Sequence, residues 1–201
     1  MSGLWNDFND AQSNANLIPK GTLAKVRMTI RPGGFDDPAQ GWTGGYARRG
    51  ATGAVYLDAE YTVLEGPYAR RKIWSLIGLY SPKGPDWANM GRSLVRGMLN
   101  SARGISDKDN SPEAQAARRI NGFADLDGLE FVARIDIGTD TNGEDKNEIR
   151  AAVTPDHRDY AQVAGAAPIQ GHQPPGQPAP QRAPAQQPAA PAAPGRPAWA
   201  Q

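Results

Sequence analysis

The chain has 201 residues, no cysteine and two histidines, and its formal net charge is +1. The lack of cysteine excludes disulfides, thiolate catalysis and cysteine-type zinc sites, and it is typical of proteins from a reducing cytoplasm. Residues 20–103 contain 13 basic and 6 acidic residues, whereas residues 104–160 contain 7 and 13. These unlike halves either cancel across an interface of their own or meet separate partners, and the sequence leaves both open.

The two ends of the chain predict little structure. Residues 1–16 are interpreted as a flexible N-terminal arm, and they do not resemble a secretory signal. Residues 161–201 are rich in Pro, Ala, Gln and Gly, a composition that buries too little apolar surface to fold, so we expect a disordered tail. Residues 17–160 remain for one domain. No apolar run approaches the ~20 residues of a membrane span, so we expect a cytoplasmic protein without a membrane partner.

Three strands are predicted in the first half of the domain. Residues 22–31 and 55–63 alternate apolar and polar side chains, as in half-buried strands. Residues 71–80 are apolar on both faces, which is typical of a covered central strand. Residues 32–53 are expected to form a long glycine-rich loop, and the turn residues 65–68 join the second strand to the third.

The second half changes from a strand period to a helical one. Asp86 is expected to cap a helix that ends at Gly104, and Ser111 a second, short helix. Residues 129–137 and 149–153 then alternate as two more strands. This order predicts a mainly β protein with helices, namely an OB-fold-like five-stranded barrel with a helix after the third strand. Another five-stranded barrel or an open α+β sheet stays open, because strand order cannot be derived from the pattern.

The sequence contains no catalytic motif. It has no Walker loop and no serine elbow. A calcium loop beginning at Gly138 fails, because that residue and Ile149 would have to supply the first and twelfth ligand positions. We therefore expect no enzyme, no metal site and no cofactor.

The four-residue sequence YARR occurs twice, at residues 46–49 and 68–71, and both copies are predicted at loop tips. Aromatic side chains among cations are suited to sequence-tolerant binding of single-stranded nucleic acid, because bases stack on the rings and phosphates meet the cations. The candidate nucleic-acid-binding residues are Arg31, Phe35, Trp42, Tyr46, Arg48, Arg49, Tyr68, Arg70, Arg71 and Lys72. The alternative for the aromatic residues of the first loop is a small cluster that folds back on itself.

Two cations of the first predicted strand have a different expected use. Lys25 and Arg27 are predicted to pair across the sheet with Asp58 and Glu60 of the second strand. The loop arginines have no acidic residue of this kind nearby in the sequence, which favours them as phosphate ligands.

Four stretches of the chain resemble a phage-associated family catalogued as a domain of unknown function (number 669). They are AVYLDAEYTVLEGPYARRKIWSLIGL, LIPKGTLAKVRMTI, NGFADLDGLEFVARIDI and KNEIRAAVTPDHRDY. Some members of that family are described as single-stranded DNA-binding proteins, and members often have glycine or lysine where this chain has Arg70. The resemblance covers about residues 17–160 and is strongest at residues 64–69. It implies a role in phage or prophage replication or recombination, within the bacterial host cell.

The residues and the resemblance together predict a non-enzymatic single-stranded DNA-binding protein that uses basic and aromatic loops. Its expected partners are single-stranded DNA and replication or recombination proteins. The alternative is a protein-interaction module, such as a replication or recombination mediator, that uses the acidic half and the proline-rich tail. The oligomeric state is left open, a homo-oligomer included.

Overall fold

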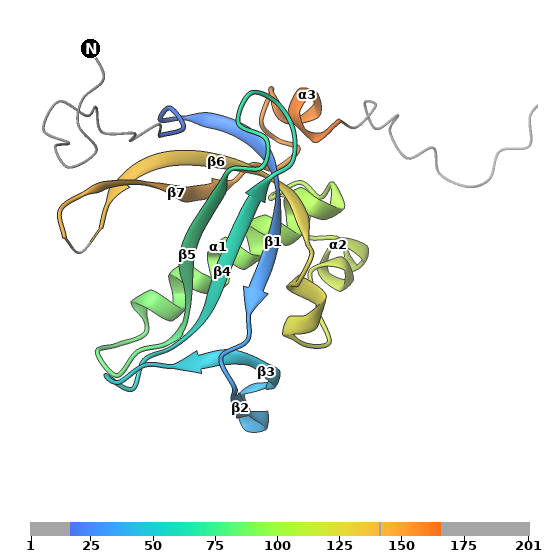
Figure 1. Ribbon diagram of the computed structural model, residues 1–201. Coiled ribbons are helices and arrows are strands. Elements are labelled where there is room, and N and C mark those ends of the chain that lie inside the picture. The colour runs from blue at the N-terminus through green and yellow to red at the C-terminus, as the bar shows by residue number, and fades with distance from the viewer. Residues whose placement is uncertain (1–16, 141, 166–201) are drawn as a thin grey trace, which may run out of the picture. The chain divides into compact units, whose positions relative to one another are not determined.

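The computed structural model describes residues 17–140 and 142–165 (Figure 1). The predicted arm, residues 1–16, lies outside the described residues, as do residues 166–201 of the predicted tail. The predicted start of the tail at residue 161 was wrong. Helix α3 (Tyr160–Ala164) packs against β-sheet residues such as Val132, so the first residues assigned to the tail belong to the folded domain.

The described chain is mainly β with a few helices, and its sheet curls into a half-barrel (Figure 1). The long strands are β1 (Thr22–Arg31), β4 (Val55–Val63), β5 (Lys72–Tyr80), β6 (Glu130–Thr139) and β7 (Asp145–Ala152). All neighbours are antiparallel: β4 lies between β5 and β1, and β6 lies between β1 and β7. The alternation of apolar residues predicted β1 and β4 correctly.

The segment predicted as a long glycine-rich loop is instead a hairpin. It contains β2 (Phe35–Asp37), the 3-10 turn η1 (Pro38–Gln40) and β3 (Trp42–Arg49). β3 pairs with the first residues of β4, so the sheet has seven strands and not the five expected. The loop prediction failed because glycines also serve ordered strands: Gly44 and Gly45 have φ angles of 85° and 70°, which few other residues adopt.

Strand β5 is an edge strand, so the prediction of a covered central strand was wrong. Among the described strands it pairs with β4 alone. Ile73 and Ile77 face the core, whereas Trp74, Leu76 and Tyr80 are 47%, 51% and 49% exposed. Apolar residues on both faces of a strand therefore did not mean burial on both faces.

Helix α1 (Asp86–Arg103) agrees with the predicted span in all but its cap. Pro85 occupies the N-cap position and Asp86 is the first helical residue. Gly104 ends the helix with a φ of 65°, and its N–H donates to the Asn100 carbonyl. Met90 of this helix is 69% exposed.

Two short elements follow α1 and lead into β6. Ser111 caps α2 (Pro112–Ala117) as predicted, because its hydroxyl accepts the Ala114 N–H. The 3-10 turn η2 (Phe123–Leu126) buries Leu126 in the core. Asp127 then accepts the Ile30 N–H at 2.8 Å, which fastens this connection to the end of β1.

The core lies between the inner face of the sheet and α1, which passes behind β4 and β5 in Figure 1. Met98 and Leu99 of α1 join Met28 and Tyr61 in one apolar cluster. The contact with β5 is close at Gly91, where an added Cβ would lie 2.0 Å from the Gly78 carbonyl oxygen. The lack of a side chain at Gly91 therefore allows α1 to approach β5 this closely.

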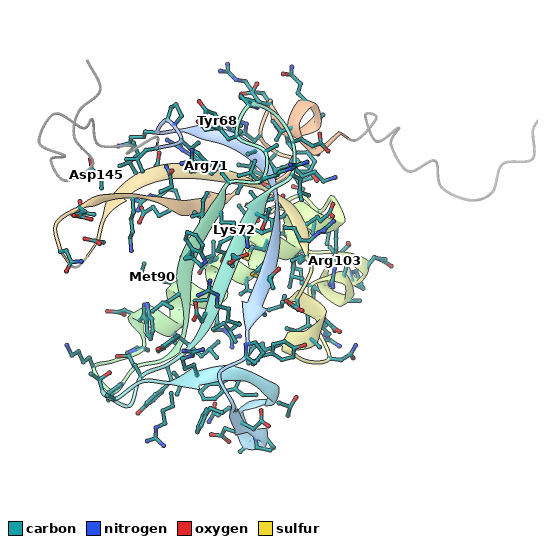
Figure 2. The ribbon with its side chains drawn as sticks, in the orientation of Figure 1. Tyr68, Arg71, Lys72, Met90, Arg103 and Asp145 are labelled. Atoms are coloured by element: carbon teal, nitrogen blue, oxygen red, sulfur yellow. The ribbon has the colours of Figure 1, made fainter. Side chains whose placement is uncertain are left out.

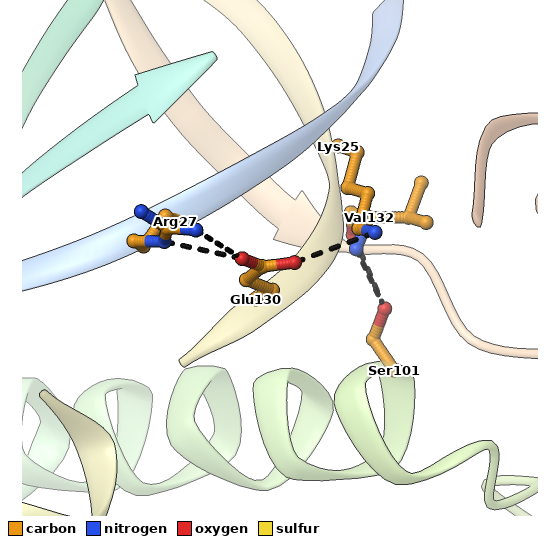
Figure 3. Close-up of polar contacts among 5 residues, drawn as sticks. All are labelled: Lys25, Arg27, Ser101, Glu130 and Val132. Carbon is orange, nitrogen blue, oxygen red and sulfur yellow. Dashed lines mark hydrogen bonds and ion pairs between the residues drawn. The ribbon is translucent and has the colours of Figure 1, made fainter. Parts of the chain in front are cut away.

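Ser101 ties the end of α1 to two other elements, and Figure 3 shows its contact with Val132. Its hydroxyl accepts the buried N–H of Val132 in β6 at 2.9 Å, and its carbonyl accepts the Tyr160 hydroxyl of α3 at 2.5 Å. The hydroxyl thus supplies an acceptor to a strand N–H that neighbouring β7 leaves unpaired. These bonds fix the position of α1 relative to the sheet.

Tyr61 is the largest side chain that is completely buried in the core, and its ring meets Phe131 edge to face at 6.0 Å. Burial raises the pKa of Tyr61 to about 12, and the neighbouring Ser75 hydroxyl opposes the shift. Within the described residues, neither hydroxyl oxygen has a hydrogen-bond partner of standard geometry. The Tyr61 hydroxyl is therefore buried with only the weak compensation that Ser75 provides.

We expect Tyr61 to make the protein sensitive to alkali. An unfolded tyrosine ionises near pH 10.0, while the folded one stays protonated to about pH 12. The free energy of unfolding should therefore be unaffected below the lower value and fall between the two, by about 3 kcal/mol in total. Tyr61→Phe should remove this loss in urea titrations at about pH 8 and about pH 11. Exposed Tyr80→Phe is the control, and an unchanged loss in Tyr61→Phe would contradict the assignment.

Candidate nucleic-acid interface

The strands β1, β4 and β5 present a second face, opposite the core, which we call the outer face. Register places its residues in rows across the three strands, for example Thr29 with Glu60 and Trp74, and Arg31 with Asp58 and Leu76. Arg48 of β3 continues this face beside Tyr56. The outer face consists of Arg27, Thr29, Arg31, Arg48, Tyr56, Asp58, Glu60, Thr62, Lys72, Trp74 and Leu76.

Glu60 organises the middle of the outer face. Its carboxylate oxygens lie 2.8 Å from the Lys72 Nζ and 3.2 Å from the Arg31 Nη2, and one of them accepts the Trp74 Nε1–H at 3.0 Å. The hydrogen bond from Lys72, then those from Trp74 and Arg31, hold the pKa of Glu60 below its ordinary value against the effect of burial. The carboxylate thereby fixes the positions of both cations and of the indole ring.

Trp74 is at once anchored and open to solvent. The Arg31 guanidinium carbon lies 5.8 Å from the centroid of its ring, within cation–π range. The side chain is nevertheless 47% exposed, and Leu76 beside it on β5 is 51% exposed. An oriented aromatic ring with a cation over one of its faces is thus available on the surface.

The expected partners of Lys25 and Arg27 were wrong. Both cations pair with Glu130 of β6, at 3.3 Å and 2.6 Å (Figure 3). The hydrogen bond from Arg27, followed by that from Lys25, lowers the pKa of Glu130 against the effect of burial. The physical reason is the register, because the first half of β1 lies beside β6, with Arg27 opposite Glu130.

The acids of β4 pair instead with three of the candidate nucleic-acid-binding residues. Arg31 and Lys72 meet Glu60, as described above, and the Arg48 Nη2 lies 3.8 Å from Asp58. Arg48 also donates to the Pro32 carbonyl at 3.2 Å. Each of these three cations already interacts with a carboxylate of the outer face. Each is therefore a weaker phosphate ligand than an unpaired arginine.

The aromatic residues of the first predicted loop pack among themselves or on the core. Phe35 and Trp42 lie 6.4 Å apart, and the Arg49 guanidinium lies 5.8 Å from the Phe35 centroid. This arrangement matches the alternative of a small cluster. Tyr46 packs against the main core, and so does Tyr68 of the other YARR copy. None of these rings is as open as Trp74.

The two YARR copies lie at opposite ends of the outer face. The first copy belongs to β3, so the prediction that it forms a loop tip was wrong. The second copy forms the turn between β4 and β5, near which Figure 2 labels Tyr68 and Arg71. Arg48 is opposite Tyr56, and Lys72 is opposite Thr62, six residues further along β4. At 3.3–3.4 Å per residue the separation is roughly 20 Å. The copies thus bracket the outer face and do not meet at one spot.

Arg70 has a backbone conformation that is unusual for its residue type. Its φ of 70° makes it the single described residue other than glycine with a positive φ. The turn requires this conformation, because the Arg70 N–H donates to the Val63 carbonyl at 2.7 Å. For a residue with a side chain, such a conformation costs about 1–2 kcal/mol. The positively charged Arg70 therefore occupies a position whose backbone conformation glycine would adopt at a lower free-energy cost.

Trp74 and Leu76 are the site residues that the sequence interpretation missed. The pattern of β4 contained the information, because its outer residues Asp58 and Glu60 are acidic, which favours a solvent-facing side of the sheet. Any strand paired with β4 must share that exposed face. Alternate residues of β5 could have been assigned to it on this ground.

The described residues contain no cluster of His, Cys, Asp or Glu side chains suited to a metal ion. Within the same ranges, no helix combines the length and the apolar character that a membrane span requires. Compared with protein-family models and with curated proteins, the chain matches none. The argument for a function therefore rests on the geometry of the outer face.

Proposed function

We propose that the protein binds single-stranded DNA on the outer face and catalyses no reaction. The observation that carries this proposal is the exposed ring of Trp74, held in place by Glu60 and flanked by Arg31 and Leu76. Stacking of bases on such a ring is worth about 1–3 kcal/mol per base and tolerates any sequence. Duplex DNA keeps its bases stacked on one another, so the same ring favours single strands.

The charge of this surface supports the proposal. On and beside the outer face, the five cations Lys25, Arg27, Arg31, Arg48 and Lys72 meet three carboxylates. Arg49 at one end, and Arg70 and Arg71 at the other, add positive charge. An excess of cations along the whole face suits a phosphate backbone that runs across it.

The fold is consistent with the same use. We interpret the five long strands, with α1 between the third and the fourth, as an OB-fold-like barrel. Barrels of that class bind oligonucleotides on the face of their second and third strands and with the loop between the first two. Here those parts are β4, β5 and the β2–β3 hairpin. A role in phage DNA replication or recombination, in the cytoplasm of a bacterial host, belongs to the proposal on the strength of the family resemblance.

Arg70→Gly tests the proposal without harming the fold. We expect the variant to gain about 1 kcal/mol in free energy of unfolding, because glycine adopts the positive φ readily. It should nevertheless bind a labelled oligothymidine more weakly, and the slope of log affinity against log salt should flatten by about 0.7. Fluorescence anisotropy at several salt concentrations measures the affinity, and urea unfolding measures the stability.

Arg158→Ala is the matched control, because its side chain is 90% exposed beside α3 and is not one of the outer-face residues. It should leave affinity and slope unchanged. Equal affinity for single-stranded and duplex oligonucleotides would contradict the proposal, as would equal flattening in both variants. Absence of any DNA binding would favour the alternative, a protein-interaction module that uses Trp74 and Leu76 as its contact.

A further inference from the structure

A cavity of about 620 Å³ lies on the other side of the sheet, between α1, β3, β5 and η2. None of its lining residues belongs to the outer face. Its walls are largely apolar and include Trp42, Leu79, Val95 and Phe123. Size and lining fall within the range of sites that take small organic ligands, in which a few polar groups set the orientation.

The polar part of the lining is strongly basic. Arg92, Arg96 and Arg118 all line the cavity, and among the described residues no aspartate or glutamate does. Arg118 donates to the Asn100 Oδ1 at 2.7 Å and to the Ser106 carbonyl at 2.9 Å, and Arg96 donates to the Asp107 carbonyl at 3.2 Å. These acceptors are neutral oxygens that hold the guanidinium groups in place. Among the acids of the adjoining loop, Asp109 interacts electrostatically with Arg118.

Arg92 is the most available of the three arginines. It is exposed on α1 and makes no hydrogen bond or ion pair with the described part of the chain. The acids of the adjoining loop do not line the cavity, and Asp107 reaches Arg118 only through the Asn100 side chain, which donates to its Oδ1 at 2.5 Å. A ligand would therefore meet a concentration of positive charge beside apolar walls.

This combination selects the chemistry of the ligand. A phosphate carries about −1.5 to −2 charges and three acceptor oxygens, so it can engage several guanidinium groups, whereas a carboxylate has one charge and two oxygens. The indole of Trp42 offers a flat apolar surface for a ring. Gln40 and Ser93, also in the lining, can hydrogen-bond to the edge of such a ring.

We propose that this cavity is a second binding site, which takes a nucleoside phosphate. The phosphate lies on Arg92, Arg96 and Arg118, and the base lies against Trp42. The ligand is either a free nucleotide or the phosphorylated end of a DNA strand, since both present the same chemistry. The site is independent of the outer face and stands whether or not that face binds DNA.

Isothermal titration calorimetry with thymidine 5′-monophosphate tests this site. We expect the nucleotide to bind at least about tenfold more tightly than either thymidine or inorganic phosphate, because each of these lacks one half of the ligand. Arg92→Ala should weaken the binding about tenfold, as expected for loss of a charged hydrogen bond. Arg119→Ala removes the same charge beside Arg118 but outside the lining, and it should have no effect.

Further measurements separate the two sources and the two sites. An oligothymidine with a 5′-phosphate that competes with the nucleotide more strongly than its unphosphorylated form identifies a strand end, and equal competition identifies a free nucleotide. Trp74→Ala should leave nucleotide binding unchanged. The proposal is overturned if the nucleotide does not bind, if Arg119→Ala weakens it as much as Arg92→Ala, or if octanoate binds more tightly than the nucleotide. Circular dichroism confirms that each variant is folded.

Discussion

Gly91→Ala is expected to lower the free energy of unfolding by about 1–3 kcal/mol or more, although alanine favours a helix by about 1 kcal/mol over glycine. The new Cβ would lie 2.0 Å from the Gly78 carbonyl oxygen and 3.0 Å from its carbonyl carbon. Both atoms belong to the backbone of β5, so no side chain can turn aside to make room. The helix must move away from the strand, which opens the core along that contact.

Gly97→Ala is the matched control within the same helix. Its Cβ would meet the Ala152 Cβ of β7 at 3.4 Å, an ordinary contact. We therefore expect a gain of about 0.5–1 kcal/mol, because only the helix propensity changes. Urea or thermal unfolding of the two variants should show effects of opposite sign. Stabilisation by both substitutions would show that α1 does not approach β5 as closely as described.

Trp74→Ala is expected to weaken binding of single-stranded oligothymidine by about 1–3 kcal/mol, which is a factor of about 5 to 150 in Kd. The loss comes from stacking and not from charge, so the salt dependence should keep its slope. This distinguishes Trp74 from Arg70, whose replacement flattens the slope. Trp74→Phe should recover part of the affinity, because it retains a smaller aromatic surface.

Met90→Ala provides the comparison for an exposed apolar side chain off the outer face. Met90 is 69% exposed on α1, and its truncation should leave Kd unchanged. Fluorescence gives a second, independent measurement: oligonucleotide should quench the emission of the wild type and of Trp87→Phe, but much less that of Trp74→Phe. An affinity of Trp74→Ala equal to that of the wild type would place the binding surface elsewhere.

The candidate site was predictable in its composition but not in its geometry. The sequence directed attention to the cations at both ends of β4, and Arg31, Arg48 and Lys72 do lie on one face. It could not show that Glu60 and Asp58 pair with them, because register between strands distant in the chain depends on the whole sheet. For the same reason the exposed ring of Trp74 on the outer face was overlooked in favour of rings that pack inward.

The sequence by itself determined the local elements, because alternation in β1 and β4, the helical period of α1 and the Gly104 stop are properties of neighbouring residues. Tertiary structure alone decided which faces are covered. Gly91 weakens α1 locally, yet only its contact with β5 explains why glycine stands there. The glycine-rich hairpin and the exposed side of β5 likewise depend on strands that pair across long stretches of chain. Local patterns carry no information about such pairing, since long-range contacts select one arrangement among several that the same pattern allows.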